Sequence, residues 1–520
     1  MLRRKLMDKL VEWKDDPNKK GLIVTGARQV GKSYLVEHFG KEHYDNYLCI
    51  NFSDENTTDI FKDNTDAATI VREIRLRYKD FIIEKNKSLL FLDEIQLCPN
   101  ARSAIKALVN NSDLDIIASG SLLGTMGLKR TDGKGSYWDP LEWLSVTVKK
   151  MDDVGEPDEF EVSAKDPTEY VKKSLTEGSV KLKPVGYEQV IEMYPMDFEE
   201  YLWAINVSEE DTDRIRENIR NKKGFTEATL NTLNRYFDQY LTVGGMPLAV
   251  LDSISSPRSG ASLIDIQTNI MNWYRSDVID YAPIEIKEKV RMCLLSIPKQ
   301  LGKRRKKFSY TDVDGQPNNG WRDYLEPISW LESMGIAQVC ECLSEPVMPL
   351  KNHINRHFKI YLSDTGLLMC GMEVGVRVAI SGGDYSINKG GIIENAVANM
   401  IERCGLELFY FERNKRYEKK DGSMAVDRIE IDFIANFDGR IAAIEVKSGN
   451  NRRASSLRKL MTDERYSMYR ISRFIKLEKS NIFVDENGVE HYPIFAAAFM
   501  DSMFEKNTIA YVKSEGPLEF

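Results

Sequence analysis

Long hydrophobic runs are missing from this sequence. Nothing in its 520 residues approaches the roughly 18 consecutive apolar residues that a membrane span requires. The N-terminal stretch MLRRKLMDKLVEWKDDPNKK is charged, and no apolar core of signal-peptide length follows it. The sequence therefore predicts a protein without a membrane partner and with a cytoplasmic location.

Cysteine pairs and excess positive charge are also absent. The seven cysteines are odd in number and scattered, which suits a reducing compartment better than a disulfide framework. The 72 Lys and Arg residues face 80 Asp and Glu residues, for a net charge of −8. Any contact with nucleic acid must therefore come from a local basic patch. The chain is long enough for about three to four domains.

A phosphate-binding loop is the first feature with chemical content. The apolar strand expected at 22–25 runs into Gly-x-x-x-x-Gly-Lys-Ser, and a helix is predicted to start at the lysine. Glycines let the backbone N–H groups turn inward around phosphates, and the helix N-terminus favours negative charge. The alternative is a glycine turn before an ordinary helix. The residues expected to surround ATP are Gly26, Ala27, Arg28, Gln29, Val30, Gly31, Lys32, Ser33 and Tyr34.

An acidic strand end supports this interpretation. Residues 88–94, SLLFLDE, form an apolar run that ends in two acids, as expected for a central parallel strand. We expect Lys32 to reach the β- and γ-phosphates and Asp93 to hold Mg²⁺ together with Ser33. Glu94 is expected to orient the attacking water. Without a preceding phosphate loop, such a strand end usually only precedes a turn.

Two more apolar strands fit the same sheet. They are expected at 47–52 and at 114–118, and Ser119-Gly120-Ser121 follows the second strand. Helical stretches at 69–79 and 102–109 alternate with the strands, so the sequence predicts an α/β fold with a doubly wound parallel sheet. Ser121 is a further candidate for nucleotide contact. A small kinase would share the loop and the sheet, but the Asp-Glu pair favours hydrolysis.

Several motifs together resemble a known family. GARQVGKS, LLFLDEIQ, the SGS strand end, MYPMDFEEYLWA and YLTVGGMPLAV occur in this order. They are similar to prokaryotic AAA-type ATPases related to the STAND class, which carry a C-terminal domain of uncharacterised function. The resemblance implies ATP binding, a helical region after the core, a winged-helix segment and a restriction-endonuclease-like terminal domain. It also implies homo-oligomers, because AAA-type ATPases often complete their sites with a neighbour's arginine.

The resemblance suggests a division into four parts. We expect an ATPase core at 1–200, a helical lid at 201–285, a winged-helix-like segment at 286–370 and a nuclease-like domain at 371–520. An acidic insertion at about 127–183 interrupts the core, and a solvated insertion is its simplest interpretation. Because of the insertion, the sequence does not single out an arginine finger. The candidates are Arg130, Arg214, Arg235 and Arg275.

A basic run provides the only candidate for a DNA contact in the middle of the chain. Residues 297–308, IPKQLGKRRKKF, contain six basic residues and no acid. A helix is predicted at 321–334, broken or restarted at Pro327, and strands at 336–342 and 357–362 would form a wing. A winged helix can place a helix in the major groove, with residues 299–307 at the phosphates. A solvated loop beside a winged helix that packs only on its neighbours is the alternative.

The last domain contains a second group of acids. A helix is predicted at 391–403 with Glu394 off its apolar stripe. Strands at 429–435 and 441–447 are joined by Asp438-Gly439, a hairpin signal, and they carry Asp432, Glu445 and Lys447. Because side chains alternate along a strand, Glu445 and Lys447 are expected on one face.

These four residues resemble the core of a PD-(D/E)XK nuclease. Glu394 would be the helix acid, Asp432 and Glu445 would bind Mg²⁺ or Mn²⁺, and Lys447 would orient the nucleophile for phosphodiester hydrolysis. The alternative is a cross-strand ion pair of Asp432 with Lys447 on an exposed face. Two functions therefore remain open. One is an ATP-controlled nuclease that acts on DNA. The other is a signalling or scaffolding switch whose inactive nuclease-like domain only binds DNA or a protein partner.

Overall fold

The computed structural model describes residues 2–61, 66–120, 188–255, 260–303, 305–316, 320–381, 390–418, 424–437, 439–447 and 455–503. Ser121, Arg130 and the acidic insertion at 127–183 lie outside these ranges. In the described parts of the chain, every helix is too short or too polar to cross a bilayer.

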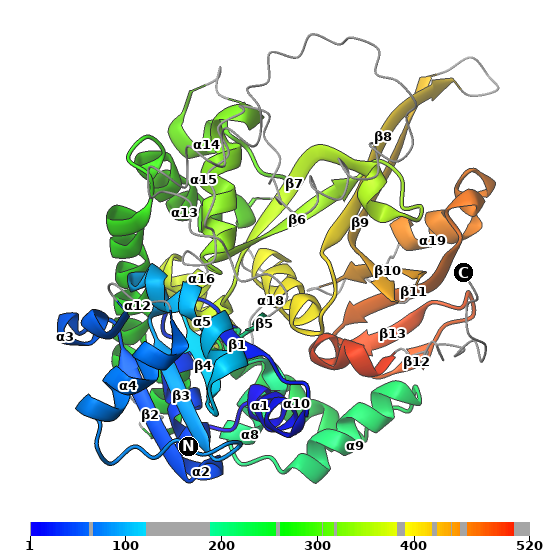
Figure 1. Ribbon diagram of the computed structural model, residues 1–520. Helices are drawn as coiled ribbons and strands as arrows, with labels where there is room; N and C mark the ends of the chain where they lie inside the picture. Colours follow the sequence, from blue (N-terminus) through cyan, green and yellow to red (C-terminus); the bar gives the residue numbers. More distant parts are fainter. Residues whose placement is uncertain are drawn as a thin grey trace, which may run out of the picture.

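A parallel sheet organises the N-terminal part, which is coloured blue and cyan in Figure 1. Its strand order is β2-β3-β4-β1-β5, with every pairing parallel. All residues of β1, β3 and β4 are buried, as expected for strands covered on both faces. The predicted doubly wound fold is thus confirmed for this part. The strands are β1 (Gly21–Thr25), β2 (Asn46–Asn51), β3 (Ser88–Asp93), β4 (Asp115–Ser119) and β5 (Glu188–Glu192).

Helices cover both faces of this sheet. α2 (Lys32–His43) buries Leu35, Val36 and Phe39 in one core, and α5 (Pro99–Asn111) packs in a separate core on the other face. The carboxyl ends of β1 and β3 therefore meet at one edge with β4 between them. The remaining helices of this part are α1 (Lys5–Asp15), α3 (Glu55–Thr58), η1 (Asp59–Phe61), α4 (Ala67–Arg77) and η2 (Ile95–Leu97).

A helical region follows β5, as expected. Its first helix begins with a capping box, in which the Asp197 side chain accepts from the Glu200 N–H at 2.8 Å and Glu200 accepts from the Asp197 N–H at 3.1 Å. This box fixes the direction in which the chain leaves β5. The helices are α8 (Phe198–Ala204), α9 (Glu209–Arg220), α10 (Glu227–Val243), α11 (Pro247–Ser255) and α12 (Gly260–Tyr281).

The expected winged-helix segment contains helices followed by an antiparallel strand pair. The predicted break at Pro327 is wrong, because α15 continues through this residue. Pro327 is buried, as are Tyr324, Ile328 and Leu331 of the same helix. This burial offsets the backbone hydrogen bond that proline cannot donate within a helix. The elements are α13 (Lys287–Leu301), α14 (Thr311–Asp314), α15 (Trp321–Ser333), β6 (Ala337–Leu343), η4 (Leu350–His353) and β7 (Ile354–Leu362).

A second sheet has eight strands in the order β12-β13-β11-β10-β9-β8-β6-β7. Because β6 pairs in parallel with β8, the strands of the expected wing extend the sheet of the C-terminal domain across residue 370. The predicted hairpin of β9 and β10 is confirmed. The further strands are β8 (Phe409–Glu418), β9 (Met424–Phe437), β10 (Arg440–Val446), β11 (Ile471–Glu478), β12 (Phe483–Val484) and β13 (Glu490–Pro493).

One helix of the C-terminal part is buried on all sides. α18 (Gly390–Arg403) contacts β7 and β10 as well as α10, α16 and η6, and in Figure 1 it lies between the two sheets. Glu394 was predicted to stand off the apolar stripe, but the helix buries every residue from Gly391 to Ile401, including this one. The other helices here are α16 (Thr365–Cys370), α17 (Val374–Ser381), α19 (Ser455–Thr462), η5 (Glu464–Tyr469) and η6 (Ile494–Met503).

The segments MYPMDFEEYLWA and YLTVGGMPLAV meet at Gly245. The Met196 N–H donates to the Gly245 carbonyl at 2.7 Å, and the Gly245 N–H donates to Asp364 Oδ2 at 2.5 Å. A Cβ at Gly245 would overlap the backbone of Met196. The close approach of three chain segments therefore requires a residue without a side chain.

Gly245→Ala should lower the melting temperature of the protein. Overpacking of this kind costs about 1–3 kcal/mol. Gly375→Ala is the matched control, because a Cβ there meets nothing within 4 Å. Differential scanning fluorimetry of both variants gives the comparison. Equal melting temperatures would contradict the close contact at Gly245.

Candidate functional site

The loop between β1 and α2 has the backbone of a phosphate-binding turn. Gly26 and Gly31 have φ values of 140° and 96°, which glycine adopts without strain. A Cβ at Gly26 would overlap the Met193 carbonyl, while Met193 and Pro247 lie against Gly31. The loop is therefore held from behind by the two motifs that meet at Gly245.

Lys32 lies across the inside of this loop. Its ammonium donates to the carbonyls of Gly26 at 3.0 Å and Ala27 at 2.9 Å. Burial lowers the pKa of Lys32, and the carboxylates of Glu94 and Asp93 oppose this shift. A buried ammonium inside a loop with two glycines at positive φ suits the binding of nucleotide phosphates.

Asp93 accepts hydrogen bonds from side chains of three other elements. Ser33 donates to its Oδ1 at 2.9 Å, Ser119 donates to the same oxygen, and Asn51 donates to Oδ2 at 3.3 Å. Mg²⁺ at phosphate sites takes few protein oxygens and keeps several waters. The hydroxyl of Ser33 and the carboxylate of Asp93 fit this requirement. Sequence reasoning missed Asn51 and Ser119 as partners, although each stands at the end of a predicted strand.

Glu94 turns sharply out of the strand. Its φ of 54° and ψ of 45° lie in the left-handed region, which is uncommon for residues other than glycine. The Gln96 side chain donates to its carboxylate. Strained backbone of this kind is concentrated at functional sites and costs about 1–3 kcal/mol. The turn holds Glu94 close enough to Lys32 to oppose the lowering of its pKa; the role of Glu94 in orienting water stays a prediction.

The helical region also reaches the loop. Arg28 forms an ion pair with Asp277 of α12, and the Tyr274 hydroxyl donates to the Arg28 carbonyl at 3.0 Å. Burial raises the pKa of Asp277, whereas Arg28 opposes this shift. Neither residue of α12 belongs to a motif, so the sequence did not predict them. Tyr34 is exposed at the start of α2.

The described arginine-finger candidates each contact a neighbour on their own helix. Arg214 pairs with Glu210 at 2.6 Å, Arg275 donates to Asn272 at 3.1 Å, and Arg235 lies 5.4 Å from the centre of the Tyr236 ring. These contacts do not distinguish among the three candidates.

The predicted acids of the C-terminal domain lie close to one another. Lys447 pairs with Glu445 Oε1 at 2.5 Å, which confirms that both side chains share a face. Asp432 accepts from the Val446 N–H at 2.8 Å. Burial and the neighbouring Glu394 carboxylate raise the pKa of Asp432 to about 6. The expected alternative, an Asp432–Lys447 pair on an exposed face, does not describe this buried arrangement.

Two lysines that sequence reasoning did not assign to this group enter it from other elements. Glu394 pairs with Lys306 and lies 3.6 Å from the ammonium of the buried Lys359 on β7. Burial opposes ionisation of Glu394, but these two lysines hold its pKa below the usual range. The three carboxylates thus face three ammonium groups.

In this arrangement Glu394 and Glu445 are paired with lysines instead of a metal ion. Among the residues that the structure describes, no three His, Cys, Asp or Glu side chains are placed to hold a metal ion. The lysines already neutralise the acids. The catalytic roles of Glu394 and Lys447 and the metal-binding roles of Asp432 and Glu445 stay predictions.

The basic run is partly engaged within the chain. Lys303 pairs with Asp312 at 2.5 Å, and Lys306 pairs with Glu394. Lys306 is largely buried, whereas Lys303 is about half exposed. DNA contact by residues 299–307 therefore stays a prediction, and the largely buried Lys306 is poorly available for it.

Comparison with known proteins identifies the N-terminal part. Residues 18–139 match the family model described as an AAA domain, and residues 234–375 match a domain of unknown function. No curated protein matches the chain. The match at 18–139, which contains the loop and both acids, shows an AAA-type P-loop ATPase domain. ATP binding and hydrolysis are the activity that it supports.

Two solved structures are similar in part. A Walker-type ATPase of Pyrococcus abyssi has 12% identity and a TM-score of 0.35, with 71% of this chain and 96% of that chain covered. The protein VC1899 from Vibrio cholerae has 10% identity and a TM-score of 0.17, with 92% and 96% covered. Both scores are too low to assign a shared overall fold.

Lys32→Ala should abolish ATP binding, because it removes the ammonium that lies inside the loop. Lys41→Ala is the matched control on the same helix, since Lys41 is exposed and pairs with Glu37 on the surface of this helix. Isothermal titration calorimetry with ATP and Mg²⁺ measures both variants. Retained affinity in Lys32→Ala would refute the assignment of the loop.

Proposed function

We propose that this protein is a cytoplasmic ATP-driven switch in which the nucleotide loop controls the C-terminal α/β domain. The supporting observation is a series of buried and partly buried hydrogen bonds that connects the loop to α18 through the backbone of residues 194–196. That helix carries Glu394 of the acidic group. The proposal includes a homo-oligomer, in which a neighbouring protomer supplies the arginine finger.

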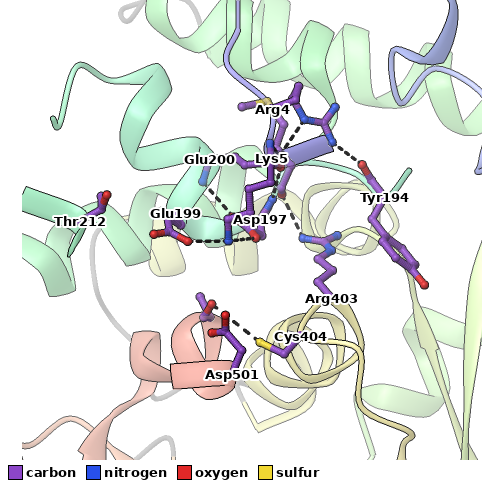
Figure 2. A network of polar contacts seen from close by, with 12 residues as sticks. Arg4, Lys5, Tyr194, Asp197, Glu199, Glu200, Thr212, Arg403, Cys404 and Asp501 are labelled. Carbon is purple, nitrogen blue, oxygen red and sulfur yellow. Dashed lines mark hydrogen bonds and ion pairs between the residues drawn. The ribbon is translucent and has the colours of Figure 1, made fainter. Parts of the chain in front are cut away.

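Arg4 makes the first connection. Its guanidinium donates to the Val30 carbonyl of the loop at 2.9 Å, to the Tyr194 carbonyl at 2.6 Å and to Glu200 at 3.1 Å. Figure 2 shows Arg4 above this group with Tyr194 on one side and Glu200 on the other. Only 6% of Arg4 is exposed. A shift of the loop on nucleotide binding must therefore move the segment after β5 or break these bonds.

Arg403 makes the second connection, at the end of α18. It donates to the Met196 carbonyl at 3.0 Å, to the Tyr240 hydroxyl at 2.8 Å and to the Ser363 carbonyl at 2.8 Å. Glu394 lies nine residues earlier on the same helix, which corresponds to about 14 Å at 1.5 Å per residue. A displacement at Met196 is thus passed to the acidic group by a rigid element.

A parallel connection reaches the end of the described chain. Lys5 pairs with Asp197 at 2.6 Å and with Glu199 at 2.5 Å. Arg216 of α9 joins Glu199 at 2.5 Å to Asp501 of η6 at 2.7 Å. Figure 2 shows Lys5, Asp197 and Glu199 together, with Asp501 on the neighbouring element. The two polar routes, which share Glu200, support the coupling of the two domains.

Arg403→Gln should uncouple the domains while leaving ATP binding intact, because Arg403 contacts the segment behind the loop and not the loop itself. Hydrogen exchange read by mass spectrometry is measured with and without a non-hydrolysable ATP analogue. We expect the analogue to change protection of α18 in the wild type but not in Arg403→Gln. Arg291→Gln, which removes an exposed pair with Glu288, is the control. No change in wild-type α18 would refute the switch.

A nuclease acting on DNA is the second candidate. Its support is the proximity of Glu394, Asp432, Glu445 and Lys447, the residue types of a phosphodiester-cleaving site. In this version the helices α13 and α15 with β6 and β7 act as a winged helix, and residues 299–307 contact DNA phosphates. Release of Lys306 from Glu394 would free a carboxylate for Mg²⁺ or Mn²⁺.

Cleavage of plasmid and oligonucleotide DNA distinguishes the two candidates. The wild type, Lys306→Ala and Asp432→Ala are incubated with Mg²⁺ or Mn²⁺, with and without ATP. A nuclease should cleave more in Lys306→Ala, since this variant frees Glu394, and should lose cleavage in Asp432→Ala. If neither the wild type nor Lys306→Ala cleaves DNA, or if cleavage persists in Asp432→Ala, the nuclease hypothesis is refuted and the switch hypothesis remains.

A further inference from the structure

The side chain of Arg28 reaches from the nucleotide loop to the helical region. Its guanidinium donates to Asp277 of α12, which lies 249 positions further along the chain. One turn earlier on the same helix, the Tyr274 hydroxyl donates to the Arg28 carbonyl at 3.0 Å. α12 therefore contacts both the side chain and the backbone of this loop residue.

The two partners of this ion pair differ in exposure. Of the Arg28 side chain 52% is exposed, whereas only 3% of the Asp277 side chain is. Asp277 lies beside the buried Val278 and one turn from the buried Tyr274. The guanidinium can therefore turn away from the pair into solvent, while the carboxylate is enclosed by the fold. Such a pair can exchange its anion for another that reaches the guanidinium from solvent.

The pair lies next to the other charges of the nucleotide site. Burial is the main cause of the lowered pKa of Lys32, Arg28 lowers this pKa further, and Asp277 opposes the shift. The pKa of Asp277 is raised by burial and, to a smaller extent, by Asp280 and Glu94. Lys32 is expected at the β- and γ-phosphates, and Glu94 beside the attacking water. The ion pair is thus placed toward the terminal phosphate of ATP.

Arginine is the cation that best suits an exchange between a carboxylate and a phosphate. Its planar guanidinium offers the same pair of N–H groups to either anion. A terminal phosphate carries more negative charge than a carboxylate at neutral pH. A terminal phosphate in the loop is therefore able to displace Asp277 from Arg28.

We propose that Arg28 binds the terminal phosphate of ATP and leaves its ion pair with Asp277 when it does so. ADP lacks this phosphate and leaves the pair in place, so Arg28 makes the loop selective for a nucleoside triphosphate. The contact is made within one chain and is separate from the arginine finger of a neighbouring protomer. The inference rests on ATP binding by the loop, which is also part of the proposed function, but not on the coupling to α18.

The exchange has a consequence for α12. A buried carboxylate that loses its cation is strongly destabilising. Asp277 must then take up a proton or move toward solvent together with its helix. ATP, but not ADP, is therefore expected to loosen the contact between α12 and the loop. The helical region thus distinguishes the triphosphate state of the site from the diphosphate state.

Calorimetric titration of the full chain with ADP and with a non-hydrolysable ATP analogue, each with Mg²⁺, tests the inference. Arg28→Gln should weaken binding of the analogue about tenfold, because one charge-assisted contact is lost, and should change ADP affinity less than about twofold. Asp277→Asn should tighten binding of the analogue about tenfold, because Arg28 no longer has to leave a carboxylate.

The double variant shows whether Asp277 acts through Arg28. The gain from Asp277→Asn should vanish in the presence of Arg28→Gln, whereas a structural or long-range effect of Asp277 would persist. Asp265→Asn is the matched control, since Asp265 is exposed on the same helix and lies more than three turns before Asp277. This control should bind both nucleotides like the wild type. A circular dichroism spectrum of each variant verifies folding.

Two results would overturn the inference while leaving ATP binding intact. One is an equal loss of ADP and analogue affinity, or no loss of either, in Arg28→Gln. The other is a gain in Asp277→Asn that is absent or that persists in the double variant. A wild type that binds neither nucleotide would instead refute the assignment of the loop, and the inference with it.

Hydrogen exchange read by mass spectrometry follows the consequence for α12. We expect the analogue, but not ADP, to lower protection of residues 274–281 in the wild type. Neither nucleotide should change their protection in Arg28→Gln, in which the ion pair is already broken. A response of α12 without one of α18 supports the inference and refutes the proposed switch, whereas a response of α18 alone overturns the inference.

Discussion

The close contact between the nucleotide loop and the backbone of Met193 is the constraint on which the rest of the structure depends. Only a glycine at position 26 permits it, and Arg4 reinforces it by binding Val30 and Tyr194 together. Because the same segment continues to Met196, whose carbonyl accepts from Arg403, the loop is connected to α18 through backbone and one arginine side chain. The contact of Gly26 with Met193 involves backbone on both sides, so no side-chain rotamer can absorb a displacement there.

The nucleotide site could be predicted from the sequence because its signals are local. The glycines, Lys32 and Asp93 belong to short motifs next to apolar strands, and the parallel sheet follows from the alternation of strands and helices. Arg4 and Asp277 could not be predicted in the same way. Arg4 meets Glu200 across 196 positions, and Asp277 meets Arg28 across 249. No periodicity or spacing encodes contacts over such separations.

The acidic group of the C-terminal part could also be predicted only in part from the sequence. Strand alternation and a turn signal were enough to predict the hairpin that brings Asp432, Glu445 and Lys447 near one another. Lys306 and Lys359 come from a loop and from β7, and no motif or spacing predicts that they lie next to Glu394. Their charges decide whether the group can accept a metal ion, so chemistry inferred from a motif depends on neighbours outside it. The predicted helix break at Pro327 was wrong for a related reason. The burial of Pro327 in α15 outweighs the tendency of proline to end a helix.

The pairing of β6 with β8 has a consequence for how this protein can be divided. The sheet crosses residue 370, so a chain cut there leaves one open strand edge on each fragment, with unpaired N–H and C=O groups along it. Both halves would then be prone to associate through that edge. Gene fusion or recombination can exchange the C-terminal module only together with the strand pair β6–β7. The module that can be exchanged therefore begins before β6.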